Sequence, residues 1–200
     1  MGTKTIRWIF FLLALFLIAP THIAYGKKER KQLKDIEVPA EDLTVSRTVF
    51  DLDVAVVVHN QALRDFKDRK YYPWCCSVIV NYDSVVAKGM PPKEEAEAVL
   101  KQIDHIDEVL KRNQEHPNAL FTARITRKGQ LQVFWQLYDA KIAQQYLDYV
   151  VSSNVLGHEM EYSISYDEDW DNVKLFVDTF DLYNDAVKNL FKEYFDEYVK

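Results

Sequence analysis

The sequence predicts an α+β fold in which two helices pack on one face of an antiparallel sheet. Apolar runs with the alternation of strands are interspersed with apolar residues at the three-and-four spacing of helices. Over residues 74–166 these elements follow one another in the order βαββαβ. That order is typical of a ferredoxin-like sandwich with a four-stranded sheet, and the wider sequence adds a strand before it and a helix after it.

The first half of this unit is a strand followed by a helix. Residues 74–82 are a β-rich apolar run that ends in a polar segment. Pro91 and Pro92 then precede residues 93–115, in which apolar side chains recur at helical spacing. These side chains are Ala96, Val99, Leu100, Ile103, Ile106 and Leu110. We therefore expect a helix with one face on the sheet.

The second half is a hairpin, a helix and a strand. Two alternating runs, residues 119–126 and 130–138, are joined by a short segment in which Gly129 permits the turn. Asp139 is a candidate N-cap for a helix that ends before Gly157. The last strand is predicted by the alternating residues Met160, Tyr162, Ile164 and Tyr166.

Two further elements flank this unit. The Val-rich stretch over residues 49–59 predicts one extra N-terminal strand. At the C-terminus, seven apolar residues at helical spacing predict a helix whose apolar side must be buried on this domain or on a partner. They are Tyr183, Val187, Leu190, Phe191, Tyr194, Phe195 and Tyr198.

The N-terminus has the features of an export signal. Lys4 and Arg7 precede an unbroken apolar run over residues 8–19, and Pro20 and a small-residue exit at Ala24-Tyr25-Gly26 follow. We therefore expect residues 1–26 to be a signal peptide that is cleaved after Gly26, and the mature protein to be periplasmic or secreted. The alternative is a retained membrane anchor, because positive charges follow the apolar run directly.

The rest of the chain divides into a charged linker, residues 27–42, and a single domain, residues 43–200. The chain holds 31 acidic and 25 basic residues, for a net charge of −6, and removal of the signal deletes two bases and no acids, which makes the mature chain −8. Nucleic acids are bound through clustered Lys and Arg. We therefore expect a protein partner and no nucleic acid.

Motifs for catalysis or cofactor binding are not apparent. The four histidines beyond the signal are His59, His105, His116 and His158, and their spacing is not that of a metal-binding motif. The mature glycines are too far apart for a phosphate-binding loop. We predict no catalytic residues, no metal and no cofactor.

One acidic segment has the register of a calcium loop. Asp167, Asp169, Asp171 and Asp178 would stand at ligand positions, and Asn172 at the sixth place, which normally holds Gly. However, the last position holds Asp instead of the longer Glu, and a predicted strand precedes the segment where a calcium loop has a helix. We therefore expect a solvated acidic loop, with calcium binding as the alternative.

Two adjacent cysteines, Cys75 and Cys76, lie in the first strand of the unit. Neighbouring side chains of a strand point to opposite faces. We expect buried thiols that act as small apolar groups. An intermolecular disulfide or a redox pair is the alternative in an exported protein.

Three short stretches carry a resemblance to a known family. They are DRKYYPW at residues 68–74, TARIT at residues 122–126 before the Gly129 hairpin, and DEDW at residues 167–170. With them, roughly residues 50–185 resemble a bacterial family known as domain of unknown function 695, akin to the regulator of ribonuclease E activity B. The resemblance implies a ferredoxin-like fold and supplies no catalytic residues. Ala123 and Gln130 stand where similar proteins usually have Gly and Arg.

One face of the predicted sheet is a candidate binding surface. On the hairpin, the core set is Leu131, Val133, Trp135 and Leu137. The opposite set is Gln132, Phe134, Gln136 and Tyr138, with Thr122, Arg124 and Thr126 across the pair. We expect this second, aromatic and polar set to line the helix-free face, where it suits contacts with a protein or peptide. The alternative, which we favour, is that the C-terminal apolar stripe covers this face.

The candidate binding residues are therefore Arg124, Phe134 and Tyr138 on the sheet, with Asp167 and Trp170 after the last strand. For Trp170 we favour a structural role, in which a buried indole with a paired N–H clamps the segment that leaves this strand.

These observations predict an exported, non-catalytic domain that binds or regulates another protein. The alternative is a small hydrolase or a thiol-dependent enzyme that uses Cys75, Cys76 or the carboxylates of residues 167–171.

Cleavage of the signal fixes the mass of the mature protein. We expect the tagged protein recovered from its native cells to have the intact mass of a chain that begins at Lys27. Recovery of the uncut chain would contradict this and would indicate a membrane-anchored domain.

Overall fold

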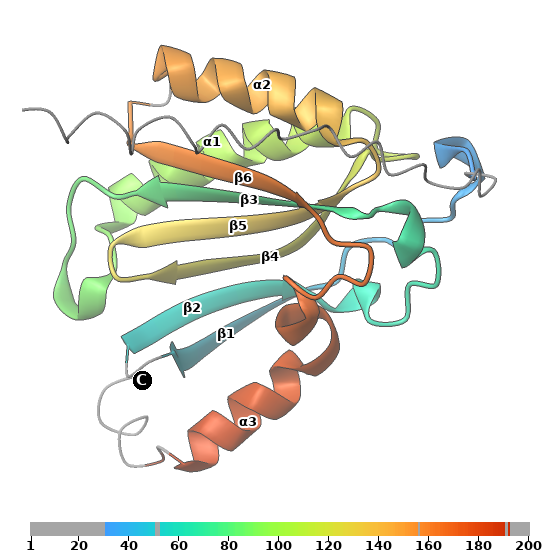
Figure 1. Cartoon of the computed structure of the whole chain (residues 1–200). Coiled ribbons are helices and arrows are strands. Elements are labelled where there is room, and N and C mark those ends of the chain that lie inside the picture. Colours follow the sequence, from blue (N-terminus) through green and yellow to red (C-terminus); the bar gives the residue numbers. More distant parts are fainter. Residues whose placement is uncertain (1–30, 51–52, 156, 191, 193–200) are drawn as a thin grey trace, which may run out of the picture. The chain divides into compact units, whose positions relative to one another are not determined.

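The computed structural model describes residues 31–50, 53–155, 157–190 and 192. Its central feature is one six-stranded sheet in which every neighbouring pair of strands is antiparallel. The strands are β1 (Leu43–Phe50), β2 (Asp53–Asn60), β3 (Trp74–Asn81), β4 (Ala119–Arg127), β5 (Gln130–Leu137) and β6 (Met160–Tyr166). Their order across the sheet is β1-β2-β4-β5-β3-β6, so that β1 and β6 form its two edges (Figure 1).

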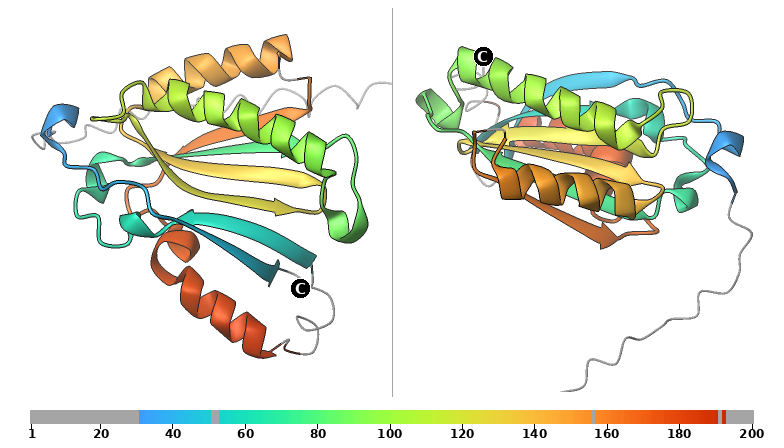
Figure 2. Two further views of the ribbon diagram at one scale, coloured as in Figure 1. Left: turned by 180° about the vertical axis from the view of Figure 1, so that it is seen from behind. Right: turned by 90° about the horizontal axis from the view of Figure 1, so that it is seen from above.

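Helices α1 (Lys93–Lys111) and α2 (Ala140–Ser153) cover one face of the sheet (Figure 2). The predicted apolar stripe of α1 is buried there, at Val99, Ile103, Ile106 and Leu110. The predicted core set of the hairpin, Leu131, Val133, Trp135 and Leu137, is fully buried beneath these helices. The mixed α/β prediction is therefore confirmed, with both central helices on the same face.

The ends of these helices follow from local chemistry. The carboxylate of Asp139 accepts a hydrogen bond from the N–H of Lys141, so the predicted N-cap of α2 is confirmed. Asn154 ends α2 in the left-handed conformation, which Asn tolerates better than most residues. Helix α1 ends at Lys111 instead of residue 115, because the chain leaves the helical conformation at Arg112 with φ of 60°.

The N-terminal part of the sheet differs from the prediction of a single strand over residues 49–59. Two strands, β1 and β2, form an antiparallel hairpin paired from Leu43 opposite Asn60 to Phe50 opposite Asp53. The reversal was not predicted because strand-forming apolar residues stand on both sides of it, Val49 and Phe50 before and residues 54–58 after. The sheet therefore has six strands, and β2 pairs with β4.

The second face of the sheet is covered by the C-terminal segment. A short π-helical turn, η5 (Leu175–Thr179), continues into α3 (Phe180–Leu190). The ring of Phe176 stacks on that of Phe134 with centroids 5.7 Å apart, and both are buried. Further along, Tyr183 stacks on Phe50 at 5.0 Å. The favoured prediction that the C-terminal segment covers this face is confirmed, but its residues differ from the predicted stripe: Tyr183 packs on the face, Leu190 is 77% exposed, and Phe176 and Phe180 supply most of the cover. Phe191, Tyr194, Phe195 and Tyr198 lie outside the described residues.

Residues 31–42 lie against the domain, although a linker was expected. They contain a short 3-10 helix, Leu33–Asp35, and Ile36 is buried in the same cluster as Phe134. The hydroxyl of Tyr138 donates to the carbonyl of Lys31, at 3.0 Å. Further 3-10 turns are Gln61–Leu63, Arg69–Tyr71 and Ala87–Gly89.

No helix in the described ranges is both long and apolar enough to cross a membrane. The predicted signal, residues 1–26, lies outside those ranges.

The stacked contact on the second face predicts a specific loss of stability. Phe176 is 6% exposed, whereas Leu182, in the same segment, is 74% exposed. We expect Phe176→Ala to lower the free energy of unfolding by about 3–5 kcal/mol, because a buried ring is replaced by a cavity. Leu182→Ala is the matched control and changes it by less than about 0.5 kcal/mol. Denaturant unfolding measures both, and equal effects would contradict the packing described.

Candidate functional site

Three of the residues predicted for the helix-free face, Phe134, Gln136 and Tyr138, lie on the face that the terminal segments cover. Phe134 is buried against Phe176, and the ring of Tyr138 contacts that of Tyr72 edge to face, with centroids 6.0 Å apart. Gln136 is fully buried and donates from Nε2 to the carboxylate of Asp167. These side chains therefore hold the C-terminal and N-terminal segments on the sheet.

Arg124 and Thr126 lie on the opposite face, contrary to the prediction. A β-bulge between Phe121 and Ala123 shifts the register, so that Arg124 pairs with Val133, which packs beneath α1 and α2. Burial lowers the pKa of the Arg124 guanidinium from its ordinary value, and Asp104 on α1 opposes this. A bulge adds one residue to a strand, which reverses the facing of the residues that follow it. Arg124 is thus separated from the other four predicted residues.

Asp167 lies at the end of β6 and is buried. Its Oδ1 accepts a hydrogen bond from the N–H of Asp171 at 2.8 Å, and its Oδ2 accepts from the N–H of Asn172 at 3.2 Å and from Nε2 of Gln136 at 3.1 Å. Three donors therefore hold this carboxylate within the turn. Asp178, the last position of the calcium-loop register, pairs with Arg69 instead.

Trp170 is fully buried beside this turn. Its indole N–H donates to the carbonyl of Tyr72 at 3.0 Å and to that of Arg69 at 3.2 Å. The residue has a φ of 61°, in the left-handed region that costs a bulky L-residue on the order of 1–2 kcal/mol. Burial of the indole and the paired N–H offset that cost. The predicted structural clamp is therefore confirmed.

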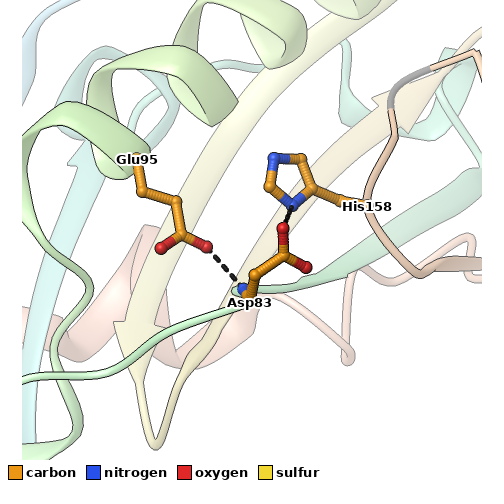
Figure 3. A group of neighbouring side chains, drawn as sticks. All are labelled: Asp83, Glu95 and His158. Carbon is orange, nitrogen blue, oxygen red and sulfur yellow. Dashed lines mark hydrogen bonds and ion pairs between the residues drawn. The ribbon is translucent and has the colours of Figure 1, made fainter.

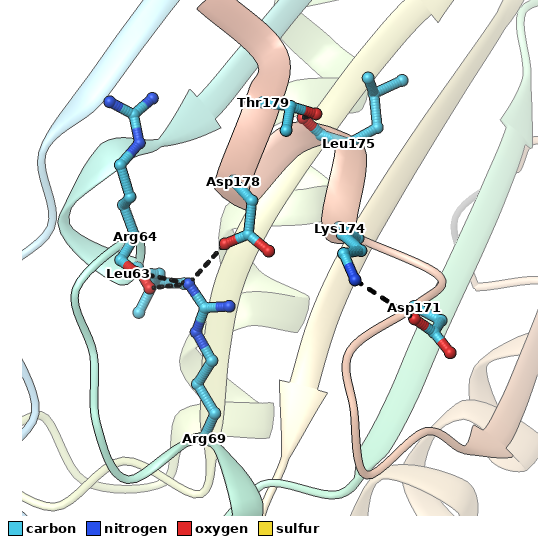
Figure 4. A network of polar contacts seen from close by, with 8 residues as sticks. All are labelled: Leu63, Arg64, Arg69, Asp171, Lys174, Leu175, Asp178 and Thr179. Carbon is cyan, nitrogen blue, oxygen red and sulfur yellow. Dashed lines mark hydrogen bonds and ion pairs between the residues drawn. The ribbon is translucent and has the colours of Figure 1, made fainter.

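Arg69 connects the clamp to the C-terminal segment (Figure 4). One guanidinium nitrogen, Nη2, donates to the carbonyls of Leu63 and Arg64 and to Oδ1 of Asp178, the last at 2.7 Å. The guanidinium carbon also lies 5.2 Å from the ring centroid of Trp170. Two of the stretches that carried the family resemblance, residues 68–74 and 167–170, therefore meet in one structural junction.

The two cysteines are buried on opposite faces of β3, as predicted. Cys75 belongs to the cluster beneath the C-terminal segment, and Cys76 belongs to the cluster beneath α1 and α2. Burial raises the pKa of each thiol to about 12. A thiol of that pKa is almost wholly protonated at neutral pH and is a poor nucleophile.

His59 is another buried titratable group, on β2 under the C-terminal segment. Its ring lies 4.8 Å from that of Phe180, and its Nε2 lies 3.7 Å from Oδ1 of Asp181. Burial lowers the pKa of His59, and the carboxylate of Asp181 opposes this. The imidazole is therefore neutral at neutral pH and serves to pack α3 on the sheet.

One group of three metal-ligand side chains is brought together in the described part of the chain: Asp83, Glu95 and His158. Sequence analysis missed this group. The three residues are far apart in the chain, so no local spacing indicates it, and only the adjacency of β3, α1 and the loop before β6 unites them.

Comparison with known proteins gives one match. The model of a family described as "Family of unknown function (DUF695)" matches residues 44–177, which is more than half of the chain. Searches of curated proteins and of solved structures gave no match.

The burial of both thiols predicts their reactivity. In the native protein we expect Cys75 and Cys76 to react with a thiol reagent at neutral pH far more slowly than in denaturant, because each thiol is buried and has a raised pKa. The measurement is a thiol titration with and without denaturant. Rapid native labelling of either cysteine would contradict the structure and would revive a thiol-dependent enzyme.

Proposed function

The chain belongs to the DUF695 family of unknown function, and we propose that it is an exported, non-catalytic domain that binds or regulates another protein. The thiols and the carboxylate that the alternative enzyme would use are engaged in structural contacts in this fold. The thiols of Cys75 and Cys76 are buried with raised pKa values, and the carboxylate of Asp167 is held by three donors. This favours binding over the alternative of a hydrolase or thiol-dependent enzyme.

The strand order supports a ferredoxin-like core within the larger sheet. Strands β6, β3, β5 and β4 are neighbours in that order, with α1 between β3 and β4 and α2 between β5 and β6. In this interpretation, the β1–β2 hairpin and the C-terminal segment are additions to a common core. A likeness of fold leaves function to be argued from surfaces.

The observation that carries the proposal is the position of β6 at an edge of the sheet. The N–H of Asp167 donates to the carbonyl of Pro73, and the N–H of Asn81 donates to that of Glu159. Hydrogen-bonded pairs alternate along antiparallel strands, so the odd-numbered residues of β6 direct their backbone groups toward β3. The even-numbered residues direct theirs away from it. These outward residues are Met160, Tyr162, Ile164 and Tyr166.

The two edges of the sheet differ. At β1, α3 packs beside the strand, and the hydroxyl of Tyr183 donates to the carbonyl of Val49 at 2.8 Å. At β6, no further strand follows within the described residues. Exposed apolar side chains lie on β6 at Tyr166 and on the C-terminal half of α2 at Val151, which lines one pocket with Met160 of β6. An edge strand beside apolar side chains is the usual template for adding a strand from a partner.

The proposed mode of binding is therefore the addition of an extended segment of the partner to β6. Backbone hydrogen bonds to the outward N–H and C=O groups would supply affinity, and the exposed side chains would supply specificity.

A pair of substitutions at Ile164 tests this mode. Ile164→Pro and Ile164→Ala both remove the side chain that packs under α2, but only the proline removes the outward N–H. In cross-linking capture on the tagged full chain in its native cells, we expect the wild type and Ile164→Ala to recover the same protein. Ile164→Pro should bind that protein about 10-fold more weakly, as expected for one lost hydrogen bond of about 1.4 kcal/mol.

Two results would contradict the proposal. Equal binding by both Ile164 variants would exclude the β6 edge as the site. Failure of the wild type to recover any recurrent protein would count against a binding domain altogether. Circular dichroism of the two variants checks that both remain folded.

A further inference from the structure

Three ligand-type side chains from separate parts of the fold point toward one another (Figure 3). Asp83 follows β3, Glu95 lies in the first turn of α1, and His158 lies in the loop between α2 and β6. One ligand atom from each residue lies within 4.8 Å of the ligand atoms of the other two. An imidazole with two carboxylates is a donor set suited to a divalent transition metal.

The spacing of these atoms is close to that of a metal site. Nδ1 of His158 lies 3.5 Å from Oδ2 of Asp83. Ligands of tetrahedral zinc at about 2.0–2.1 Å from the metal are about 3.3 Å from one another. The same separation is longer than a good hydrogen bond, and Nδ1 is buried with no hydrogen-bond partner. A metal ion between the two groups would satisfy this nitrogen.

Glu95 is held in place by the loop that carries Asp83. Its Oε2 accepts from the hydroxyl of Ser84 at 2.6 Å, and its Oε1 accepts from the backbone N–H of Asp83. The hydrogen bond from Ser84 is the main cause that lowers the pKa of Glu95, so the carboxylate is ionised at neutral pH. Oε1 also accepts a longer hydrogen bond from the N–H of Ser84, at 3.4 Å, so Oε2 is the oxygen that retains a lone pair for a metal. Hydrogen bonds of this kind orient the ligands of metal sites.

The backbone also fixes His158. Gly157 has a φ of 70°, which favours glycine, and it turns the chain from α2 toward the cluster. The following residue, Glu159, is hydrogen-bonded to Asn81 at the end of β3. The backbone N–H of Asn81 donates to the carbonyl of Glu159, and its Nδ2 donates to the Glu159 carboxylate. The side chain of His158 is only 12% exposed, whereas that of Asp83 is 73% exposed. The His158 side of the cluster is thus rigid, and the Asp83 side is open to water.

We propose that His158, Asp83 and Glu95 form a binding site for one divalent transition-metal ion, with zinc as the fitting case. The metal binds Nδ1 of His158 and one oxygen from each carboxylate, and water completes the tetrahedron on the open side of Asp83. The ion joins α1, the loop after β3 and the loop before β6. The site is independent of the partner proposed for β6.

The test is calorimetric titration of zinc chloride into the untagged mature protein after chelator treatment and dialysis. We expect one saturable equivalent of zinc, and NMR signals of the His158 ring that shift on binding. His158→Ala should weaken binding by more than about 10-fold, since it removes a direct ligand. Ser84→Ala should weaken it by about 10-fold, the lower end of the cost of losing an outer-shell hydrogen bond.

His105→Ala is the matched control, because His105 is an exposed histidine on α1 beside Glu108. We expect it to bind zinc as the wild type does. Absence of saturable binding would overturn the proposal and leave only the 3.5 Å contact between His158 and Asp83. Unchanged binding by the folded Ser84→Ala and His158→Ala variants would also overturn it, because the zinc would then occupy another part of the acidic surface.

Discussion

The buried indole of Trp170 is the contact on which the second layer of this domain depends. Its N–H pairs with carbonyls of the segment that precedes β3, and Arg69 from that segment lies over the ring and reaches Asp178. The chain can therefore leave β6, turn at Asp167 and return across the sheet. Phe176 and Phe180 then bury the face that α1 and α2 leave uncovered. Without this junction, the aromatic face around Phe134 would be exposed to water.

Much of the fold was predictable because its local signals agree. The strands of the β4–β5 hairpin, the N-cap at Asp139 and the helical stripe of α1 each follow from spacing within a few residues. The β1–β2 hairpin was not predicted, because strand-forming apolar residues stand on both sides of its reversal. The β-bulge near Phe121 was also missed, since one extra residue leaves no clear mark in composition, yet it moves Arg124 to the other face.

The candidate sites were less predictable than the fold. Trp170 and Asp167 were singled out by sequence, and the structure places both in the junction that closes the second face. Asp83, Glu95 and His158 come together only through tertiary packing, which no local motif encodes. The outward backbone groups of β6 likewise depend on its position at the edge of the sheet. Both proposals thus depend on features that arise from the arrangement of strands and helices in space and not from a local sequence motif.

Hydrogen exchange of the intact protein tests most directly whether the C-terminal segment is a fixed layer of the domain. The N–H groups of Val173, Phe176 and Val177 are hydrogen-bonded within the buried part of this segment that precedes α3. If the Trp170 junction holds the segment on the sheet, these amides exchange as slowly as those of the buried face of α1. Exchange at the rate of an unfolded chain, with α1 protected, would contradict the account and would show the aromatic face to be open.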